Sequence, residues 1–228
     1  MITHKKEFTG GVVLFLGFMA VLVIMFLPVF NGQNGLKAMD SLYNSISKGS
    51  VYYIPELKGE AEKYKDNEIT VTIAMSSEQQ AKETVPLFEK GGAQTELSGK
   101  EIKVSGNLQK IIVNCLEDAD HMFANNGEKV KEKYNYAEKK VLYNWWKALK
   151  AMDKNLTKQK KFSEAKFISS VGKKAVECSY NYYEIEPQKI ADKYGIVFIS
   201  LLFYIVYTIW YGFSIMFMFE GWGLKLED

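Results

Sequence analysis

Two long apolar runs flank a more polar middle segment of the chain. The first run, residues 10–30, contains 21 residues without a charge, and the second, residues 194–219, contains 26. A helix rises about 1.5 Å per residue, so each run is long enough to cross a hydrocarbon layer roughly 30 Å thick. The pattern therefore predicts a membrane protein with two transmembrane helices.

The first run also resembles a signal peptide, because Lys5 and Lys6 precede it. A signal peptide, however, has an apolar core of only about 7–15 residues, followed by a cleavage site with small residues. The run in this chain is longer, and no such site follows it. We therefore expect an uncleaved span.

Two spans place both ends of the chain on the same side of the membrane. The lysines before the first span favour the cytoplasm for that side, although Lys189 and Lys193 before the second span weaken the signal. We expect a plasma (inner) membrane protein with cytoplasmic tails at residues 1–9 and 220–228. Residues 31–193 would then form a periplasmic or extracellular domain.

This domain begins with an amphipathic helix, predicted by apolar residues at helical spacing: Leu36, Met39, Leu42, Tyr43 and Ile46. In EITVTIA, residues 68–74, apolar and polar residues alternate as in a half-buried strand. A helix capped by Ser76 or Ser77 follows, and we expect Pro86 to kink or shorten it. A hairpin around Ser98-Gly99 completes a small β-α-β-β unit at residues 67–105.

Residues 107–185 are predicted to form a bundle of three helices. The first has an apolar face from Leu108 to Phe123. The second is marked by a strict three-four stripe of Leu142, Trp145, Leu149, Met152 and Leu156. The third, from about Phe162 to Tyr183, has a core stripe of Phe167, Val171, Cys178 and Tyr182. The expected fold is mainly α: two transmembrane helices flanking an α+β domain with a helical bundle.

The composition argues against nucleic-acid binding. All 29 basic residues are lysines, the formal net charge is only +2, and arginine, the usual residue for two-pronged recognition of phosphates and bases, is absent. The sequence also contains no GxSxG, P-loop, GxGxxG, CxxC or CxxCH motif. We therefore expect neither an enzyme nor a cofactor.

One acidic cluster has the spacing of a metal site. Its members are Glu117, Asp118, Asp120 and His121. A carboxylate three residues before a histidine occurs in carboxylate-bridged metal sites, but such sites need a second half that this chain lacks. A site for a hard cation built from Glu117, Asp118 and Asp120 is the alternative. We expect instead a solvated acidic face and no metal.

The two cysteines leave two alternatives open. Cys115 and Cys178 both fall on apolar helix faces. They would form a disulfide in an oxidising compartment, or remain two buried thiols.

A stripe of hydroxyl groups marks one face of the second span. Ser200, Tyr204, Tyr207, Tyr211 and Ser214 follow one another at intervals of four, three, four and three residues. Lipid offers no hydrogen-bond partner at mid-depth, and the first span has almost no polar side chain. Thr208 and Gly212, four apart, would permit close approach of another helix nearby. We therefore expect these seven residues to form an interface with other integral membrane subunits or a second copy of the chain, with the bilayer around it.

Three functions compete on this basis. The first is a non-catalytic accessory or structural subunit of a larger membrane complex. The second is an extracytoplasmic ligand-binding or sensing module, weakened because the expected cytoplasmic tails hold no output domain. The third is a subunit that binds a quinone or lipid at the tyrosine face. Trp145-Trp146 and residues 180–187 would suit a ligand groove, although aromatic residues at helical spacing more often belong to the core.

Overall fold

The computed structural model describes residues 2–224 and divides into two compact units. Unit 1 contains the chain up to Ile46 together with the chain from Gln188 onward, and unit 2 contains Ser47–Pro187. Most of the described residues are helical, which confirms a mainly α protein with a small sheet.

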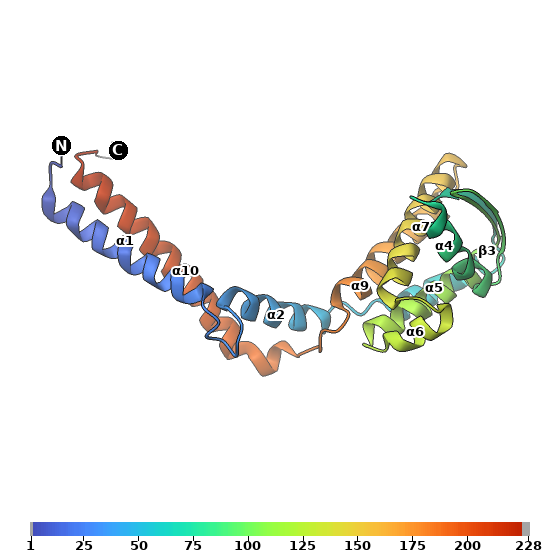
Figure 1. The fold of residues 1–228 in the computed structure, drawn as a ribbon, viewed down its shortest axis with the longest axis horizontal. Coiled ribbons are helices and arrows are strands. Elements are labelled where there is room, and N and C mark those ends of the chain that lie inside the picture. Colours follow the sequence, from blue (N-terminus) through green and yellow to red (C-terminus); the bar gives the residue numbers. More distant parts are fainter. Residues whose placement is uncertain (1, 225–228) are drawn as a thin grey trace. The chain divides into compact units, whose positions relative to one another are not determined.

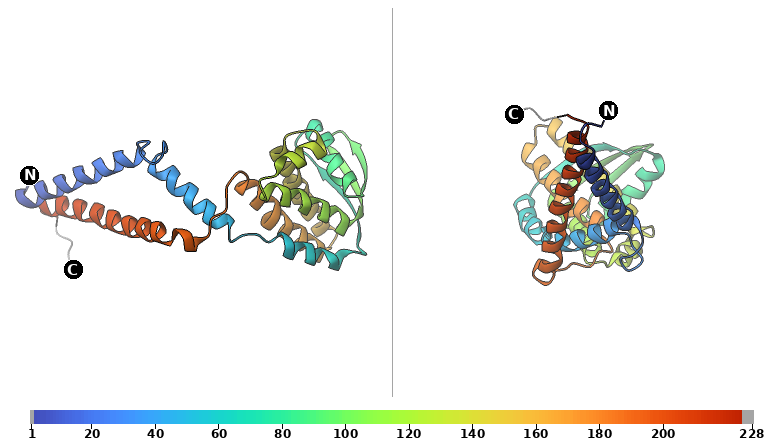
Figure 2. Two further views of the ribbon diagram at one scale, coloured as in Figure 1. Left: turned by 90° about the horizontal axis from the view of Figure 1, so that it is seen from below. Right: turned by 90° about the vertical axis from the view of Figure 1, so that its left-hand side faces the viewer.

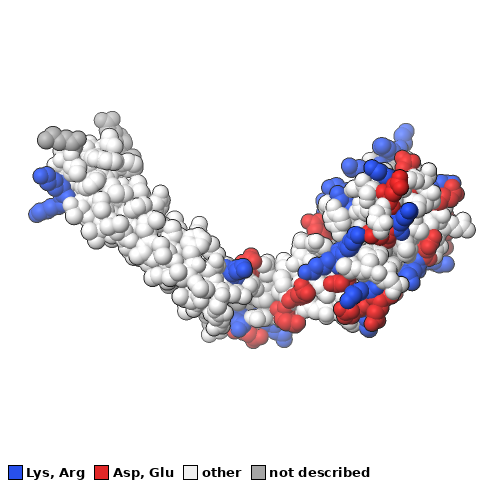
Figure 3. Space-filling model, in the orientation of Figure 1, with Lys and Arg blue, Asp and Glu red and all other residues white. Residues whose placement is uncertain are grey.

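Unit 1 is built from α1 (Lys5–Phe26), most of α2 (Gly35–Lys48) and α10 (Ile190–Gly221) (Figure 1). Both α1 and α10 are long and apolar enough to cross a membrane. Figure 3 shows that the displayed surface of these two helices is nearly free of charge between their ends. The helix α1 ends before Pro28, short of the predicted boundary at residue 30. The proline causes this early end, because its ring disfavours the helical conformation of the residue before it.

The helices α1 and α10 pack side by side and antiparallel. Phe18 lies against Tyr207, with ring centroids 4.3 Å apart, and Phe8 lies against Gly221. At the same end, the backbone N–H groups of Thr3 and His4 both donate to the carbonyl of Gly221, at 2.9 and 3.0 Å. The start of α1 and the end of α10 therefore meet, as Figure 2 also shows.

Unit 2 combines a three-stranded sheet with a set of helices. Its first elements are α3 (Ile54–Ala61), the short 3₁₀ helix η1 (Glu62–Tyr64), β1 (Glu68–Ala74), α4 (Glu78–Lys90), β2 (Gln94–Ser98) and β3 (Glu101–Asn107). The remaining elements are α5 (Leu108–Phe123), α6 (Gly127–Tyr134), α7 (Glu138–Lys158), α8 (Phe162–Val171), the π-helical segment η2 (Gly172–Glu177) and α9 (Cys178–Tyr182).

The sheet has the order β1-β3-β2 with antiparallel neighbours, so the predicted strand and hairpin are confirmed. In the register, Ile102 of β3 lies between Ile73 of β1 and Leu97 of β2. The free edge of β1 is covered, because Asn155 and Gln159 of the α7 region donate to the carbonyls of Thr72 and Thr70 at 3.0 and 2.9 Å. These bonds satisfy groups that an open sheet edge would expose.

Helix α4 starts as predicted but is not shortened by its proline. The Ser77 hydroxyl accepts a hydrogen bond from the backbone N–H of Gln80 at 3.1 Å, so Ser77 is the N-cap. The helix nevertheless continues past Pro86 to Lys90, and the next two residues, Leu87 and Phe88, are completely buried. Burying two large apolar side chains offsets the roughly 3 kcal/mol that an internal proline costs.

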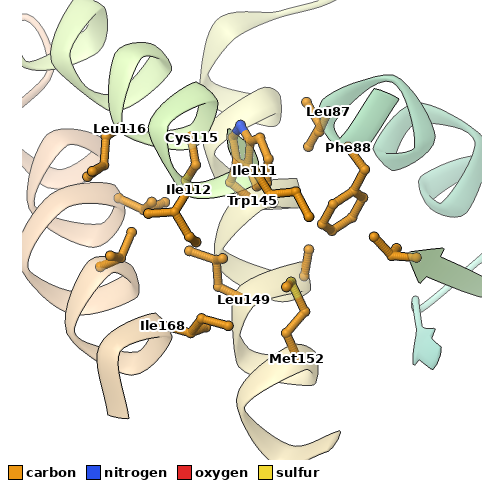
Figure 4. Packing of buried hydrophobic residues seen from close by; sticks show 14 of the residues in the cluster. Leu87, Phe88, Ile111, Ile112, Cys115, Leu116, Trp145, Leu149, Met152 and Ile168 are labelled. Carbon is orange, nitrogen blue, oxygen red and sulfur yellow. The ribbon is translucent and has the colours of Figure 1, made fainter. Parts of the chain in front are cut away.

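The core of unit 2 forms where α4, α5, α7 and α8 meet (Figure 4). Figure 4 shows Trp145 of α7 among labelled side chains of α4 and α5; the Trp145 and Phe88 rings meet edge-on, with centroids 5.4 Å apart. The predicted stripe on α7 is confirmed, since all five of its members are buried.

Three features of unit 2 differ from the prediction. Helices α3 and α6 were not predicted. Each has in its first turn a residue type that commonly interrupts helices, Pro55 in α3 and Gly127 in α6. The predicted stripe on the last helix is correct at Phe167 and Val171 but wrong at Cys178 and Tyr182. Ser179 is buried in place of Cys178, and Tyr183 packs against the core in place of Tyr182. The π-helical segment causes this shift, because its wider turn moves the buried face on by one residue.

Candidate functional site

The acidic cluster of α5 does not converge on a metal site. Asp118 is completely buried, and its carboxylate accepts hydrogen bonds from Lys133 and Tyr134 at 2.6 Å and from Trp145 at 2.8 Å. Burial beside this carboxylate raises the pKa of Tyr134 far above its ordinary value, so the phenol remains a donor. Asp118 therefore ties α5 to α6 and α7.

The other members of the cluster lie elsewhere on the helix. Asp120 accepts hydrogen bonds from Tyr52 at 2.7 Å and Lys58 at 2.9 Å, whereas Glu117 is exposed and His121 only partly buried. Within residues 2–224, no three His, Cys, Asp or Glu side chains come together as metal ligands would.

Both cysteines are free thiols in the structure. Cys115 is completely buried, and burial raises its pKa well above the ordinary value, which keeps the thiol protonated and unreactive. Cys178 is partly exposed, and its thiol contacts the carbonyl of Val51 at 3.6 Å. The structure thus contains two thiols, of which only Cys115 is buried.

Three hydroxyl groups of the α10 stripe find partners within the chain. Ser200 and Ser214 donate to carbonyls three residues earlier in their own helix, at 2.8 and 2.7 Å, and Ser200 also contacts the Tyr43 hydroxyl at 2.7 Å. Tyr207 donates to the carbonyl of Phe18 in α1 at 3.0 Å. Although α1 has almost no polar side chain, its backbone thus offers an acceptor to Tyr207, because a helical carbonyl keeps a second lone pair.

The α1–α10 contact uses a second bond of the same kind. The indole N–H of Trp210 donates to the carbonyl of Leu14 at 3.0 Å. Tyr207 and Trp210 are three residues apart on α10, and the carbonyls of Leu14 and Phe18 are four apart on α1. These two bonds fix the register of the helices.

Two tyrosines of the stripe remain without a hydrogen bond among the described residues. Tyr204 is 67% exposed and Tyr211 is 46% exposed. The Tyr211 ring touches Phe18, with centroids 5.2 Å apart, but its hydroxyl has no acceptor in residues 2–224. Thr208 donates to the carbonyl of Tyr204 at 2.8 Å, which satisfies it locally.

Small residues on the two helices divide between an inner and an outer surface. A Cβ added to Gly11 would lie 2.7 Å from the backbone nitrogen of Met218, and one added to Gly17 would lie 2.9 Å from Trp210. These glycines permit the close approach of α1 and α10. A Cβ added to Gly212 would meet nothing within 4 Å, so Gly212 lies on the uncovered side of α10.

A second candidate site is a groove on unit 2, between α7 and the segment formed by η2 and α9. A hollow of about 250 Å³ is lined by Leu142, Tyr143, Trp146, Glu177, Tyr180 and Asn181. The adjacent tryptophans thus divide: Trp145 belongs to the core, and Trp146 lines the groove. Tyr180 and Asn181 belong to the segment 180–187, which the sequence analysis considered as a possible lining of a ligand groove. Together with Trp146, they do line the hollow.

Comparison with known proteins adds no further information, since no family model, curated protein or solved structure matches the chain significantly.

Proposed function

We propose that this protein is a non-catalytic accessory subunit of a larger membrane protein complex, docked through the uncovered side of α10 and through unit 2. The proposal includes two membrane-spanning helices, both ends in the cytoplasm and unit 2 outside it, in the plasma (inner) membrane. The non-catalytic role rests on the sequence, which lacks the motifs of nucleophilic, nucleotide-dependent and redox enzymes.

The observation that carries the proposal is the pair of unpaired tyrosine hydroxyls on α10. The contacts of α10 with α1 place Tyr207 opposite Phe18 and Trp210 opposite Gly17, close to the middle of α1. Tyr211 therefore lies near the middle of the paired region, where lipid chains would surround it. A phenol there is stabilised by an acceptor from another polypeptide, since the chain itself gives it none among the described residues.

The experiment compares two sets of phenylalanine variants. Tyr204→Phe with Tyr211→Phe removes the two unpaired hydroxyls, whereas Tyr207→Phe removes the one already bonded to α1. Transmembrane hydrogen bonds average about 0.6 kcal/mol each, so the double variant should weaken assembly by about 1.2 kcal/mol, or roughly sevenfold. Tyr207→Phe should leave assembly unchanged. Native-gel migration after extraction in mild detergent measures the assembled fraction at a series of dilutions.

Two results would count against this function. Migration of the unaltered protein at the mass of a single chain would overturn the subunit proposal. Normal assembly of the double variant, with loss of a quinone- or lipid-dependent activity, would assign the tyrosine face to a small ligand.

The groove beside Trp146 favours a second candidate function, that of an extracytoplasmic binding module anchored by two helices. Under this alternative unit 2 would bind its ligand, and α1 and α10 would serve only as an anchor. Substitutions in the groove should impair only the binding function, and substitutions on the tyrosine face should impair only the assembly function. The two surfaces share no residue.

A further inference from the structure

The hollow beside Trp146 is one end of a longer groove. A second hollow of about 270 Å³ shares Trp146 and Glu177 with the first, and a third, wider one of about 450 Å³ shares Asp153 and Lys173 with the second. The groove thus follows α7 from Leu142 to Thr157, about 22 Å at the helical rise. An extended peptide, at about 3.3 Å per residue, would fill it with roughly seven residues.

The π-helical segment shapes the wall opposite Trp146. Gly172, Lys173 and Glu177 of η2 all line the second hollow, and a Cβ on Gly172 would lie only 4.0 Å from Leu149 of α7. Single π-helical turns within α-helices are frequent at functional sites.

The groove carries an excess of positive charge. Lys150, Lys166, Lys173 and Lys174 line it, and Lys147 lies over the Trp146 ring at 5.2 Å. None of these five lysines forms an ion pair among the described residues. Of the residues that line the groove, the four lysines are offset by two carboxylates, Asp153 and Glu177, which leaves a net charge of +2.

Exposed aromatic rings lie at both ends of the groove. Tyr143 and Tyr180, 41% and 42% exposed, lie at one end, and Phe162, 63% exposed, lies at the other. The occupant must therefore offer negative charges along its length and apolar side chains at intervals.

We propose that this groove binds an acidic peptide segment of a partner protein, about seven residues long and extended, with apolar side chains in the hollows beside Trp146. Its carboxylates would contact Lys150, Lys166, Lys173 and Lys174. The hollows on either side of a half-buried Trp146 suit inserted side chains better than a flat bilayer surface, which would need the indole to project outward. This inference does not depend on the proposed role of α10, because it concerns a separate surface.

The probe is a displayed library of random nine-residue peptides, selected on the full chain in nanodiscs of neutral lipid, with empty nanodiscs as the background. We expect the selected peptides to be enriched in Asp and Glu with at least one large apolar residue. Lys150→Gln with Lys173→Gln should weaken binding of the selected peptides about tenfold, and raising the salt concentration from 0.05 to 0.5 M should weaken it further.

The matched control is Lys82→Gln with Lys110→Gln, which removes the same charge from exposed positions outside the groove. This control should bind the selected peptides as the unaltered protein does. The proposal is overturned if no peptide is enriched over empty nanodiscs, if the selected peptides are not acidic, or if both double variants bind equally. It is also overturned if Trp146 becomes protected from an aqueous quencher only in nanodiscs of anionic lipid, which would assign the face to the bilayer.

Discussion

At the scale of single residues, neighbouring side chains in this protein have opposite roles. Trp145 is completely buried, packs edge-on against Phe88 and donates its indole N–H to Asp118 at 2.8 Å. Trp146, the next residue, is only half-buried, and the ammonium groups of Lys147 and Lys150 lie over its ring at 5.2 and 4.9 Å. One ring stabilises the fold, and the other shapes a surface.

This difference predicts unequal effects of two alanine substitutions. Trp145→Ala should lower the free energy of unfolding by about 3–5 kcal/mol, because it leaves a cavity and removes a donor from a buried carboxylate. Trp146→Ala should lower it by at most about 2 kcal/mol, since solvent already reaches the ring. Urea unfolding of the full chain in detergent, followed by circular dichroism, measures both. Equal losses at the two positions would contradict the assigned orientation of α7.

The same residues show how far sequence reasoning reaches at this scale. The spacing of apolar residues along α7 predicted that Trp145 lies in the core, because the buried face of an amphipathic helix can be recognised from this spacing. The partners of Asp118 come from α6 and α7, whose approach depends on tertiary packing, so the sequence placed this carboxylate on a solvated face. The acceptor of Tyr207 is a backbone carbonyl, which no side-chain pattern marks.

At the scale of elements, the glycines of the two long helices are not equivalent. Gly11 and Gly17 lie where α1 meets α10, and Gly212 lies on the uncovered side of α10. A large side chain should therefore disrupt the hairpin at the first two positions and leave it intact at the third.

Leucine at these positions tests the assignment. Gly11→Leu should separate α1 from α10, because the new Cβ would lie 2.7 Å from the backbone of Met218, which cannot move aside as a flexible side chain can. Gly212→Leu should preserve the hairpin while obstructing partners on the uncovered side of α10. Disulfide formation between cysteines introduced at Phe18 and Tyr207 would report the packing. Efficient crosslinking in the Gly11→Leu background would show that the packing differs from that described.

Regular elements were predictable from the sequence where their pattern was long and their ends were marked. The strand at residues 68–74, the capped α4 and the stripe of α7 are of this kind. The segment η2 has no such mark, because its sequence, GKKAVE, also suits an ordinary helix. Helix α6 has only Val130 and Tyr134 as buried large side chains, too few for a readable period.

At the scale of the whole molecule, unit 2 is an insertion between the two halves of unit 1. The two ends of the insertion are tied together: Lys48, nearly completely buried, donates to the carbonyl of Ile185 at 2.6 Å and to the side chain of Asn125 at 2.8 Å. The ring of Phe123 lies 5.1 Å from the same ammonium group. Desolvation by burial lowers the pKa of Lys48, because the fold takes its ammonium group out of water.

The expected topology rests on two observations: the antiparallel packing of α1 and α10, and the lysines at the start of α1. Within unit 1, the start of α1 and the end of α10 lie together, which an antiparallel pair of membrane-spanning helices requires. Lys5 and Lys6 at that end favour the cytoplasm, so a reporter active only in the cytoplasm should function when fused at either end of the chain.

A single cysteine introduced at Lys129 of unit 2, in a chain without Cys115 and Cys178, should react in intact cells with a reagent that cannot cross the membrane. The same cysteine at Lys6 should react only after the cells are opened. Labelling of the Lys6 position in intact cells, or a mature chain that begins near Gly32, would show that the two-span topology is wrong.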